Sequence, residues 1–286
     1  MDPFIFNSVD KLIEKGAADG PIKTFNKTWE LVFGKFHFYV DKVQHKRKLD
    51  FEKFKEQFKN EISSVPEENL QEPQISVLGP ALEASRFYIN EKDLSNMFAK
   101  LIASSMDNRK NTSTHHSFVE IIKQLSPNDA ILLKHINNSE VIPAVKFKAI
   151  VNSSNDRIDI SDSLIKDSPL DIESTEISIN NLVRLGIINE NFGLNSLTKE
   201  GIYNDFYDSK FSNHFNKFIE DKRLSKSLGI INPLLNSGES FLNISKLVNI
   251  EYETLKSLYV PWVIDFDKGS LTISAYGKAF VKTCVN

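Results

Sequence analysis

The sequence is poor in the residues and patterns that define several protein classes. It has a single cysteine, Cys284, in 286 residues, so it can form neither an internal disulfide nor a multi-cysteine zinc site. No stretch approaches the roughly 20 apolar residues that span a bilayer. The start, Met1-Asp2-Pro3-Phe4, lacks the basic region and the apolar run of a signal peptide. We therefore expect a cytoplasmic protein.

The sequence also has little net charge. Lysine and arginine number 35 against 38 aspartates and glutamates, which gives a formal net charge of −3. Such a balance provides no overall attraction to nucleic acid, so charge has to be examined segment by segment. The clearest local excess lies in residues 22–48, which carry seven basic and two acidic side chains.

Catalytic signatures are missing as well. The sequence contains no GxSxG elbow, no phosphate-binding GxxxxGK[ST] loop and no HExxH metal motif. Cys284 lies on an apolar helix face, where a free cysteine usually behaves as a small hydrophobic residue. We expect no enzyme, no cofactor, no bound metal and no small-molecule substrate.

What the sequence does contain is helical periodicity. Apolar residues from Ile22 to Val43 recur at alternating steps of three and four, which predicts a long amphipathic helix. The pattern slips at residues 45–48 and resumes in a new phase, so we predict a helical hairpin that buries both seams. The seam positions are Ile22, Phe25, Trp29, Val32, Phe36, Tyr39 and Val43, then Phe51, Phe54, Phe58 and Ile62.

Proline and polar residues suggest where one section ends and the next begins. Residues 63–73 are polar and contain two prolines, which is typical of a linker or boundary. One further helix is predicted to begin after Asn90 and to carry the apolar face of residues 94–102. Another is predicted to begin at the Ser126-Pro127 cap. We predict a helical hairpin at 1–65, a central helical domain at 66–137 and a winged-helix-like domain at 138–286. Residues 137–175 hold short β-rich pieces that the pattern does not assign.

Two stretches near the end of the chain repeat each other at an offset of 76 residues, with eight matching positions between 179–201 and 255–277. Each copy predicts a helix, a strand, a glycine turn at Gly193 or Gly269, a second strand and a new helix. Thr198 or Ser274 is placed to cap that last helix. A long aromatic helix, 202–218, would separate the copies. The predicted fold is therefore mainly α, with a C-terminal winged-helix-like part that contains two small β-hairpins.

The predicted winged-helix part raises the question of DNA binding. Its candidate reading helix, residues 178–186, carries Asn180, Asn181 and Arg184 as candidate nucleic-acid contacts. One arginine offers little to a DNA backbone, because DNA binding commonly relies on several phosphate contacts. A protein-docking or purely structural module is favoured, and a DNA-binding regulator is the alternative.

The basic segment suggests a second kind of contact. Trp29 and Phe33 precede the cluster Lys46, Arg47 and Lys48, and an aromatic face beside cations suits an interfacial helix at an anionic membrane. These five residues are candidates for membrane or partner contact. The favoured interpretation is a bundle helix whose basic end is solvated, and a peripheral membrane effector is the alternative.

Several longer strings point to a known family. They are LGPALE at 78–83, LSNMFAKLIASSMD at 94–107, HSFVEIIKQLSPNDA at 116–130, NLVRLGII at 181–188 and YGKAFVKTC at 276–284. They resemble the Abi-alpha family, the abortive infection alpha proteins of bacterial phage defence, well over 73–130 and loosely over 65–286. The usual His-Pro before FVEIIKQLSP is here His115-His116 followed by Ser117. The resemblance implies antiviral defence, in which an infected cell stops growing before phage matures, and it supplies no mechanism.

These observations together lead to one expected function. We expect a non-enzymatic antiviral protein that acts through protein contacts and associates with itself through the N-terminal seam. The alternatives are the winged-helix DNA-binding regulator and the peripheral membrane effector described above.

Overall fold

The computed structural model of the chain describes residues 19–33, 44–151, 157–193, 197–223, 231, 233–234, 237–259 and 262–286. They form two compact units, each drawn from separate parts of the sequence. Unit 1 consists of Met1–Glu140, Asn181–Asn189 and Ile273–Asn286, and unit 2 of Val141–Asn180 and Glu190–Thr272. The three-domain division with boundaries after residues 65 and 137 stays a prediction.

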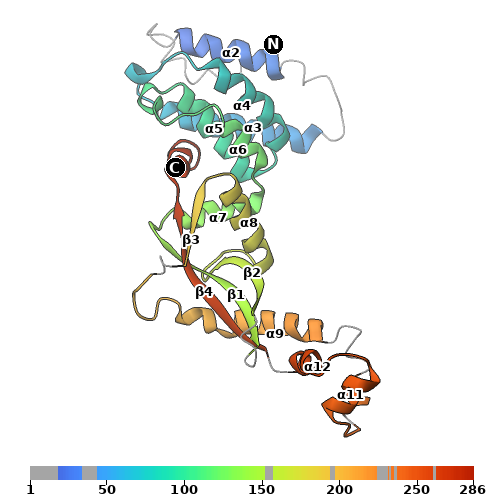
Figure 1. The fold of residues 1–286 in the computed structure, drawn as a ribbon. Coiled ribbons are helices and arrows are strands. Elements are labelled where there is room, and N and C mark those ends of the chain that lie inside the picture. The colour runs from blue at the N-terminus through green and yellow to red at the C-terminus, as the bar shows by residue number, and fades with distance from the viewer. Residues whose placement is uncertain are drawn as a thin grey trace. The chain divides into compact units, whose positions relative to one another are not determined.

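Unit 1 is helical (Figure 1). Its core includes phenylalanines from helices that are far apart in the sequence, among them Phe58, Phe98 and Phe280, none of which is exposed. Its elements are α2 (Asp19–Phe33), α3 (Gln44–Ser63), η2 (Glu67–Asn69), α4 (Ile75–Tyr88), α5 (Lys92–Ser105), η3 (Asn108–Lys110), α6 (Phe118–Gln124), α7 (Pro127–Ile136) and α13 (Ala275–Cys284).

Helices α2 and α3 meet along an aromatic seam. The ring centroids of Phe25 and Phe58 are 4.4 Å apart, and those of Phe33 and Phe51 are 5.1 Å apart. Because higher numbers on α2 face lower numbers on α3, the two helices run antiparallel. Aromatic pairs at these separations add to the stability that area burial already provides. The seam residues predicted between Phe36 and Val43 lie outside the described residues.

The predicted cap of α7 is confirmed. Ser126 accepts a hydrogen bond from the backbone N–H of Asp129 (3.1 Å), and the Asp129 carboxylate accepts one from the backbone N–H of Ser126 (2.7 Å). This reciprocal capping box satisfies two donors that the first turn of a helix leaves without intrahelical partners. Pro127 follows at the first helical position, where its missing N–H is not needed.

The start of α13 lies unusually close to the segment that follows α8. Ser274 caps α13 as predicted, with its hydroxyl accepting from the backbone N–H of Gly277 (2.8 Å). The backbone N–H of Ser274 donates to the carbonyl oxygen of Ile187 (2.9 Å), and its hydroxyl donates to the carbonyl oxygen of Gly186 (2.6 Å). A Cβ on Gly277 would lie only 2.0 Å from the Ile187 oxygen. Glycine is therefore required there by close packing.

Unit 2 contains an antiparallel sheet with the strand order β2-β1-β4-β3. Phe147 of β1 faces Phe266 of β4, and both belong to an aromatic core shared with Phe211 and Phe215 of α9. Figure 1 shows α9 beside the sheet. The elements that contribute to unit 2 are β1 (Ile142–Val151), β2 (Arg157–Ile165), α8 (Ile172–Arg184), β3 (Ile188–Phe192), η4 (Asn204–Tyr207), α9 (Ser209–Arg223), α11 (Phe241–Leu247), α12 (Tyr252–Tyr259) and β4 (Trp262–Ile273).

A mainly α fold is confirmed, and the hairpin predicted in the second copy is wrong, whereas residues 194–196 of the first copy's predicted hairpin lie outside the described residues. Strand β4 runs without a turn through Gly269, and its neighbour is β3 from the other copy. Gly269 serves close approach, because a Cβ there would lie 2.5 Å from the ring of Phe192. In the first copy, residues 197–198 form no strand, and Thr198 caps no helix within the described residues. The β1–β2 hairpin instead occupies the stretch that the sequence left unassigned.

The aromatic helix expected at 202–218 is divided in two. A 3-10 turn, η4, ends before Asp208, which has an extended backbone (φ −63°, ψ 155°), and α9 follows. The break lets Phe206 and Phe211 both reach the aromatic core, where they are 1% and 3% exposed. Core packing thus divides the segment into two elements, and Tyr207 between them is 58% exposed.

Candidate functional site

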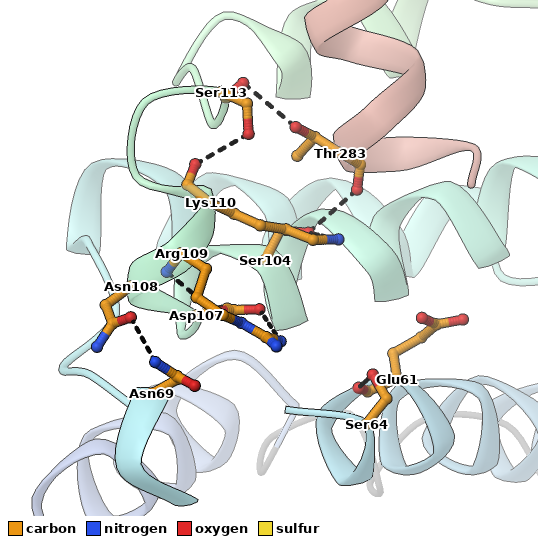
Figure 2. A network of polar contacts seen from close by, with 10 residues as sticks. All are labelled: Glu61, Ser64, Asn69, Ser104, Asp107, Asn108, Arg109, Lys110, Ser113 and Thr283. Carbon is orange, nitrogen blue, oxygen red and sulfur yellow. Dashed lines mark hydrogen bonds and ion pairs between the residues drawn. The ribbon is translucent and has the colours of Figure 1, made fainter. Parts of the chain in front are cut away.

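Three of the strings that carry the family resemblance, 94–107, 116–130 and 276–284, contribute to one place within unit 1, where the loop between α5 and α6 lies against α13 (Figure 2). We call this place the α13 junction. The contacts join residues separated by more than 150 positions in the sequence. The junction consists of Ser104, Asp107, Arg109, Lys110, Ser113, His115, Ser117, Tyr276 and Thr283.

A buried carboxylate lies at the base of this loop. The side chain of Asp107 is 1% exposed, and it accepts hydrogen bonds from Nε (2.9 Å), Nη2 (2.7 Å) and the backbone N–H (3.0 Å) of Arg109. Burial alone raises the pKa of Asp107. The hydrogen bonds from Arg109 and the charges of Arg109 and Lys110 outweigh that effect, so the pKa lies below its usual 3.8. Asp107 is therefore a buried anion that its own loop neutralises.

The polar segment 63–73, expected as a linker or boundary, is tied to this loop. Leu70 forms an antiparallel bridge with Asp107, and the backbone N–H of Gln71 donates to the carbonyl oxygen of Met106 (2.9 Å). The side-chain amides of Gln71 and Asn111 bond each other in both directions. Figure 2 shows a further amide pair from the same two loops, Asn69 with Asn108 at 3.0 Å. These bonds hold the α5–α6 loop in place, and none of them involves α13.

Helix α13 is attached to the loop through its last turn. The hydroxyl of Ser104 donates to the carbonyl oxygen of Thr283 (3.1 Å), and the hydroxyl of Thr283 donates to the carbonyl oxygen of Ser113 (3.2 Å) (Figure 2). The ammonium of Lys110 reaches the Ser104 hydroxyl (3.2 Å). Cys284 is fully buried, and burial raises the pKa of its thiol well above the ordinary value. The thiol is thus neutral and inaccessible, as a structural cysteine would be.

A chain of hydrogen bonds through two hydroxyl groups attaches the first turn of α13 to the loop before α6. Nδ1 of His115 lies 2.6 Å from the Ser117 hydroxyl and accepts a hydrogen bond from the Ser117 backbone N–H (3.2 Å). A ring nitrogen that accepts carries no proton, so the Ser117 hydroxyl donates to it and in turn accepts from the Tyr276 hydroxyl. A serine beside an imidazole can be a nucleophile. Within the described residues no carboxylate orients the His115 ring, and the bond to Tyr276 gives the chain a clear role in holding α13.

The candidate nucleic-acid contacts are engaged within the protein. Asn180 donates to Asp162 (2.7 Å) inside unit 2. In unit 1, Asn181 donates to Asp129 (2.8 Å), and Arg184 donates from Nη1 to Gln124 (2.9 Å). Arg184 also bonds Asn181 through Nη2 (2.7 Å). Asn181 and Arg184 thus fix the end of α8 to the α6–α7 turn.

The candidate membrane contacts divide into two groups. Trp29 and Phe33 stack on each other at 4.4 Å within the seam against α3, and Phe33 is only 3% exposed. The segment Lys46-Arg47-Lys48 lies in the first turns of α3, and its side chains are outside the described residues. The predicted surface that combines the two groups therefore lies outside the described residues. The packed aromatic pair favours the bundle-helix interpretation.

Sequence reasoning missed the polar residues of the junction. Asp107, Lys110 and Thr283 fit no motif, since each looks like an ordinary loop or helix-end residue. The available signal was that Asp107 and Thr283 fall inside strings that resemble one family, although strings alone do not reveal that they touch. No helix in the described ranges is long and apolar enough to cross a membrane. Among the same residues, no cluster of three or more His, Cys, Asp or Glu side chains could hold a metal ion.

Comparison with known families finds a match. The sequence model described as abortive infection alpha matches residues 46–284, which include the whole α13 junction and leave out α2 of unit 1. The chain finds no match among curated proteins or among solved structures.

Proposed function

The chain belongs to the abortive infection alpha family, and from this membership we propose that it is an antiviral protein that halts growth of an infected cell before phage matures. It acts in the cytoplasm, without catalysing a reaction, by contacting another protein or a second copy of itself. The family match over residues 46–284 carries this proposal.

Two exposed side chains support action through contact. Leu31 on α2 is 77% exposed and Phe87 on α4 is 74% exposed, the largest values for big hydrophobic residues in the described part of the chain. Aromatic and aliphatic side chains of this size are typical anchors when a partner covers them. The N-terminal seam already packs against α3, so self-association would use these outer faces of α2 and α4.

The chemical groups of the junction support a role without catalysis. The Ser117 hydroxyl is held between His115 and Tyr276, where it fastens a helix. The Cys284 thiol is buried and its pKa is raised, which disfavours the thiolate that a cysteine nucleophile needs. Both groups have a structural use in their present positions.

The winged-helix-like part would serve docking in this proposal. In each repeat copy a helix is followed by a strand, α8 by β3 and α12 by β4, and the two strands are neighbours in the sheet. Asn181 and Arg184 form hydrogen bonds within unit 1. The end of α8 is therefore poorly suited to contacting DNA bases.

The decisive experiment is phage challenge of bacteria with and without the gene, at high and low phage dose. An abortive mechanism predicts that the culture collapses at high dose and survives at low dose, because infected cells are lost before they release phage. Survival at both doses would indicate a defence that spares the infected cell, and equal lysis with and without the gene would refute a defence role.

The contact mechanism has its own test. We expect Leu31→Ser combined with Phe87→Ser to keep the fold, since both side chains are mostly solvated, and to abolish protection. The matched control is Leu242→Ser combined with Leu247→Ser, which removes exposed leucines (51% and 68%) from α11 in unit 2. Protection that survives the first pair would exclude these faces of α2 and α4 as the contact. Sedimentation of both variants reports self-association directly.

A further inference from the structure

We propose that two copies of the chain pair through the free edge of β2, so that their two sheets become one continuous antiparallel sheet. The pairing is centred on Ile158, and a twofold axis there places Arg157 of each copy opposite Asp159 of the other. This contact is separate from the exposed faces of α2 and α4, and it does not depend on the proposed defence role.

The first observation is an edge that is closed at one end and open at the other. β2 is an outer strand of the sheet and has β1 as its neighbour on one side (Figure 1). At the closed end, the backbone N–H of Asp162 donates to Glu176 of α8 (2.8 Å), and the carbonyl oxygen of Asp162 accepts from the Ser161 hydroxyl (2.8 Å). Along residues 157–159, which we call the open β2 segment, no second strand pairs with this edge in the described part of the chain. Unpaired backbone groups of this kind are a template for another strand.

The second observation is that the open β2 segment lacks the usual protection of a sheet edge. Native edges are protected by bulges or by charges that repel a second strand. The bulge in this hairpin lies beside Phe147, after Asp159. The segment carries one arginine and one aspartate, so its charges cancel and do not repel a second copy.

The charges of the open β2 segment are available for a partner. Arg157 and Asp159 are exposed, and their side chains form no hydrogen bond or ion pair among the described residues. Lys148 faces Asp159 across the hairpin, but its ammonium is paired with Asp267. Both charges can therefore be matched from outside the chain.

The third observation is that one register matches these charges. With the axis at Ile158, each Arg157 is opposite the Asp159 of the second copy, and the reverse pair follows by symmetry. Opposite charges at opposed positions stabilise paired strands, and like charges destabilise them. An axis at Arg157 or at Asp159 would oppose like charges. An axis at Ile160 would place Ile158 against Asp162, whose backbone groups are already bonded.

The side chain of Ile158 gives the pair an apolar centre. Ile158 lies opposite Ala149 of β1, on the sheet face that also carries the buried Phe147, yet it is 54% exposed. In the proposed register the two Ile158 side chains are direct neighbours, an arrangement that suits β-branched residues. A strand from another protein would have to present the same charge spacing in reverse, which a second copy provides by symmetry. The segment is short, so the contact is weak and reversible, and its test has to trap the pair.

The test traps the pair with a disulfide in the full chain. Ile158→Cys places two thiols at the axis, where opposed Cα atoms are about 4.5–5.5 Å apart and a disulfide accepts about 4.4–6.8 Å. The native Cys284 does not interfere, because it is buried and burial raises the pKa of its thiol. We expect mild oxidation to give a covalent dimer. The matched control is Ile177→Cys on α8, which is more exposed (68%) and should cross-link only at the slower rate of random collisions.

Charge variants in the Ile158→Cys background test the register. Arg157→Asp opposes like charges in both symmetric pairs and should slow cross-linking roughly 3- to 30-fold. Asp159→Arg should have the same effect. The two substitutions together should restore the parent rate, because each charge again meets its opposite. Thermal melts of all three variants should match the parent, since both side chains are exposed.

Two results would overturn the proposal. The first is equal cross-linking of Ile158→Cys and Ile177→Cys, which would mean that the copies meet only by collision. The second is a double charge variant that stays as slow as either single one. Both results concern purified protein, so they leave the outcome of the phage challenge, which tests the defence role, unaffected.

Discussion

Replacing Gly277 by alanine is expected to destabilise unit 1, although glycine to alanine usually favours a helix by about 1 kcal/mol. The new Cβ would lie 2.0 Å from the carbonyl oxygen of Ile187, whereas real Cβ contacts are essentially never shorter than 3.0 Å. The start of α13 must therefore move by at least 1.0 Å, the difference between these two distances. That movement strains both hydrogen bonds that Ser274 makes to the segment after α8.

The cost can be worked out from these contacts. Overpacking costs roughly 1–3 kcal/mol, and each lost hydrogen bond about 1 kcal/mol. Subtracting the helix-propensity gain leaves a net loss of roughly 2–4 kcal/mol. The matched control is Gly79→Ala in α4, where the new Cβ would meet no atom within 4 Å. That variant should gain about 0.5–1 kcal/mol, so the same substitution is predicted to have opposite signs at the two sites.

The assay should follow unit 1 alone, because two units can unfold separately. The chain has two tryptophans, Trp29 in unit 1 and Trp262 in unit 2, so Trp29 fluorescence in a Trp262→Phe background reports unit 1. Urea unfolding of both glycine variants in that background gives the two free energies. A Gly277→Ala midpoint equal to or above that of the parent would refute the close approach of α13 to Ile187.

Three more predictions follow from individual contacts. Asp107→Asn should cost about 1–3 kcal/mol at neutral pH. Because the pKa of Asp107 is lowered in the folded state, this difference should be present above pH 3.8 and disappear as the pH falls further, in urea melts against pH. Ser126→Ala should cost about 1 kcal/mol in thermal melts and Ser126→Asp much less, and equal losses would contradict the capping role. Since Trp29 and Phe33 pack against α3, pelleted anionic and neutral liposomes should retain equally little protein. Retention by anionic liposomes alone, lost when Lys46-Arg47-Lys48 is changed to glutamate, would overturn that view.

Local chemistry could be predicted from the sequence because it depends on near neighbours. The caps at Ser126 and Ser274 needed only a hydroxyl three residues before a backbone N–H. The seam at Ile22, Phe25 and Trp29 needed only helical spacing, whereas the next buried seam residue is Phe33 and not the predicted Val32. The glycine at 269 misled because a glycine permits either a turn or the close approach of another strand, and local sequence does not distinguish these uses.

The candidate site depended on distant neighbours and was therefore missed. The Asp107 carboxylate accepts bonds from Arg109 two residues on, but its backbone bridge to Leu70 joins two distant segments and follows no spacing rule. Tyr276 finds Ser117 across 159 positions, a pairing that one sequence does not encode in any visible pattern.

The docking of α13 on α6 also has a consequence for how the chain is made. Phe118 and Phe280 meet edge to face at 5.3 Å, and both are fully buried. A ribosome delivers Phe118 more than 150 residues before Phe280, at a rate on the order of 5–20 residues per second. For several seconds the nascent α5–α6 surface lacks its cover, which makes it a natural client for a holding chaperone. The α5–α6 surface is therefore completed only after α13 has left the ribosome.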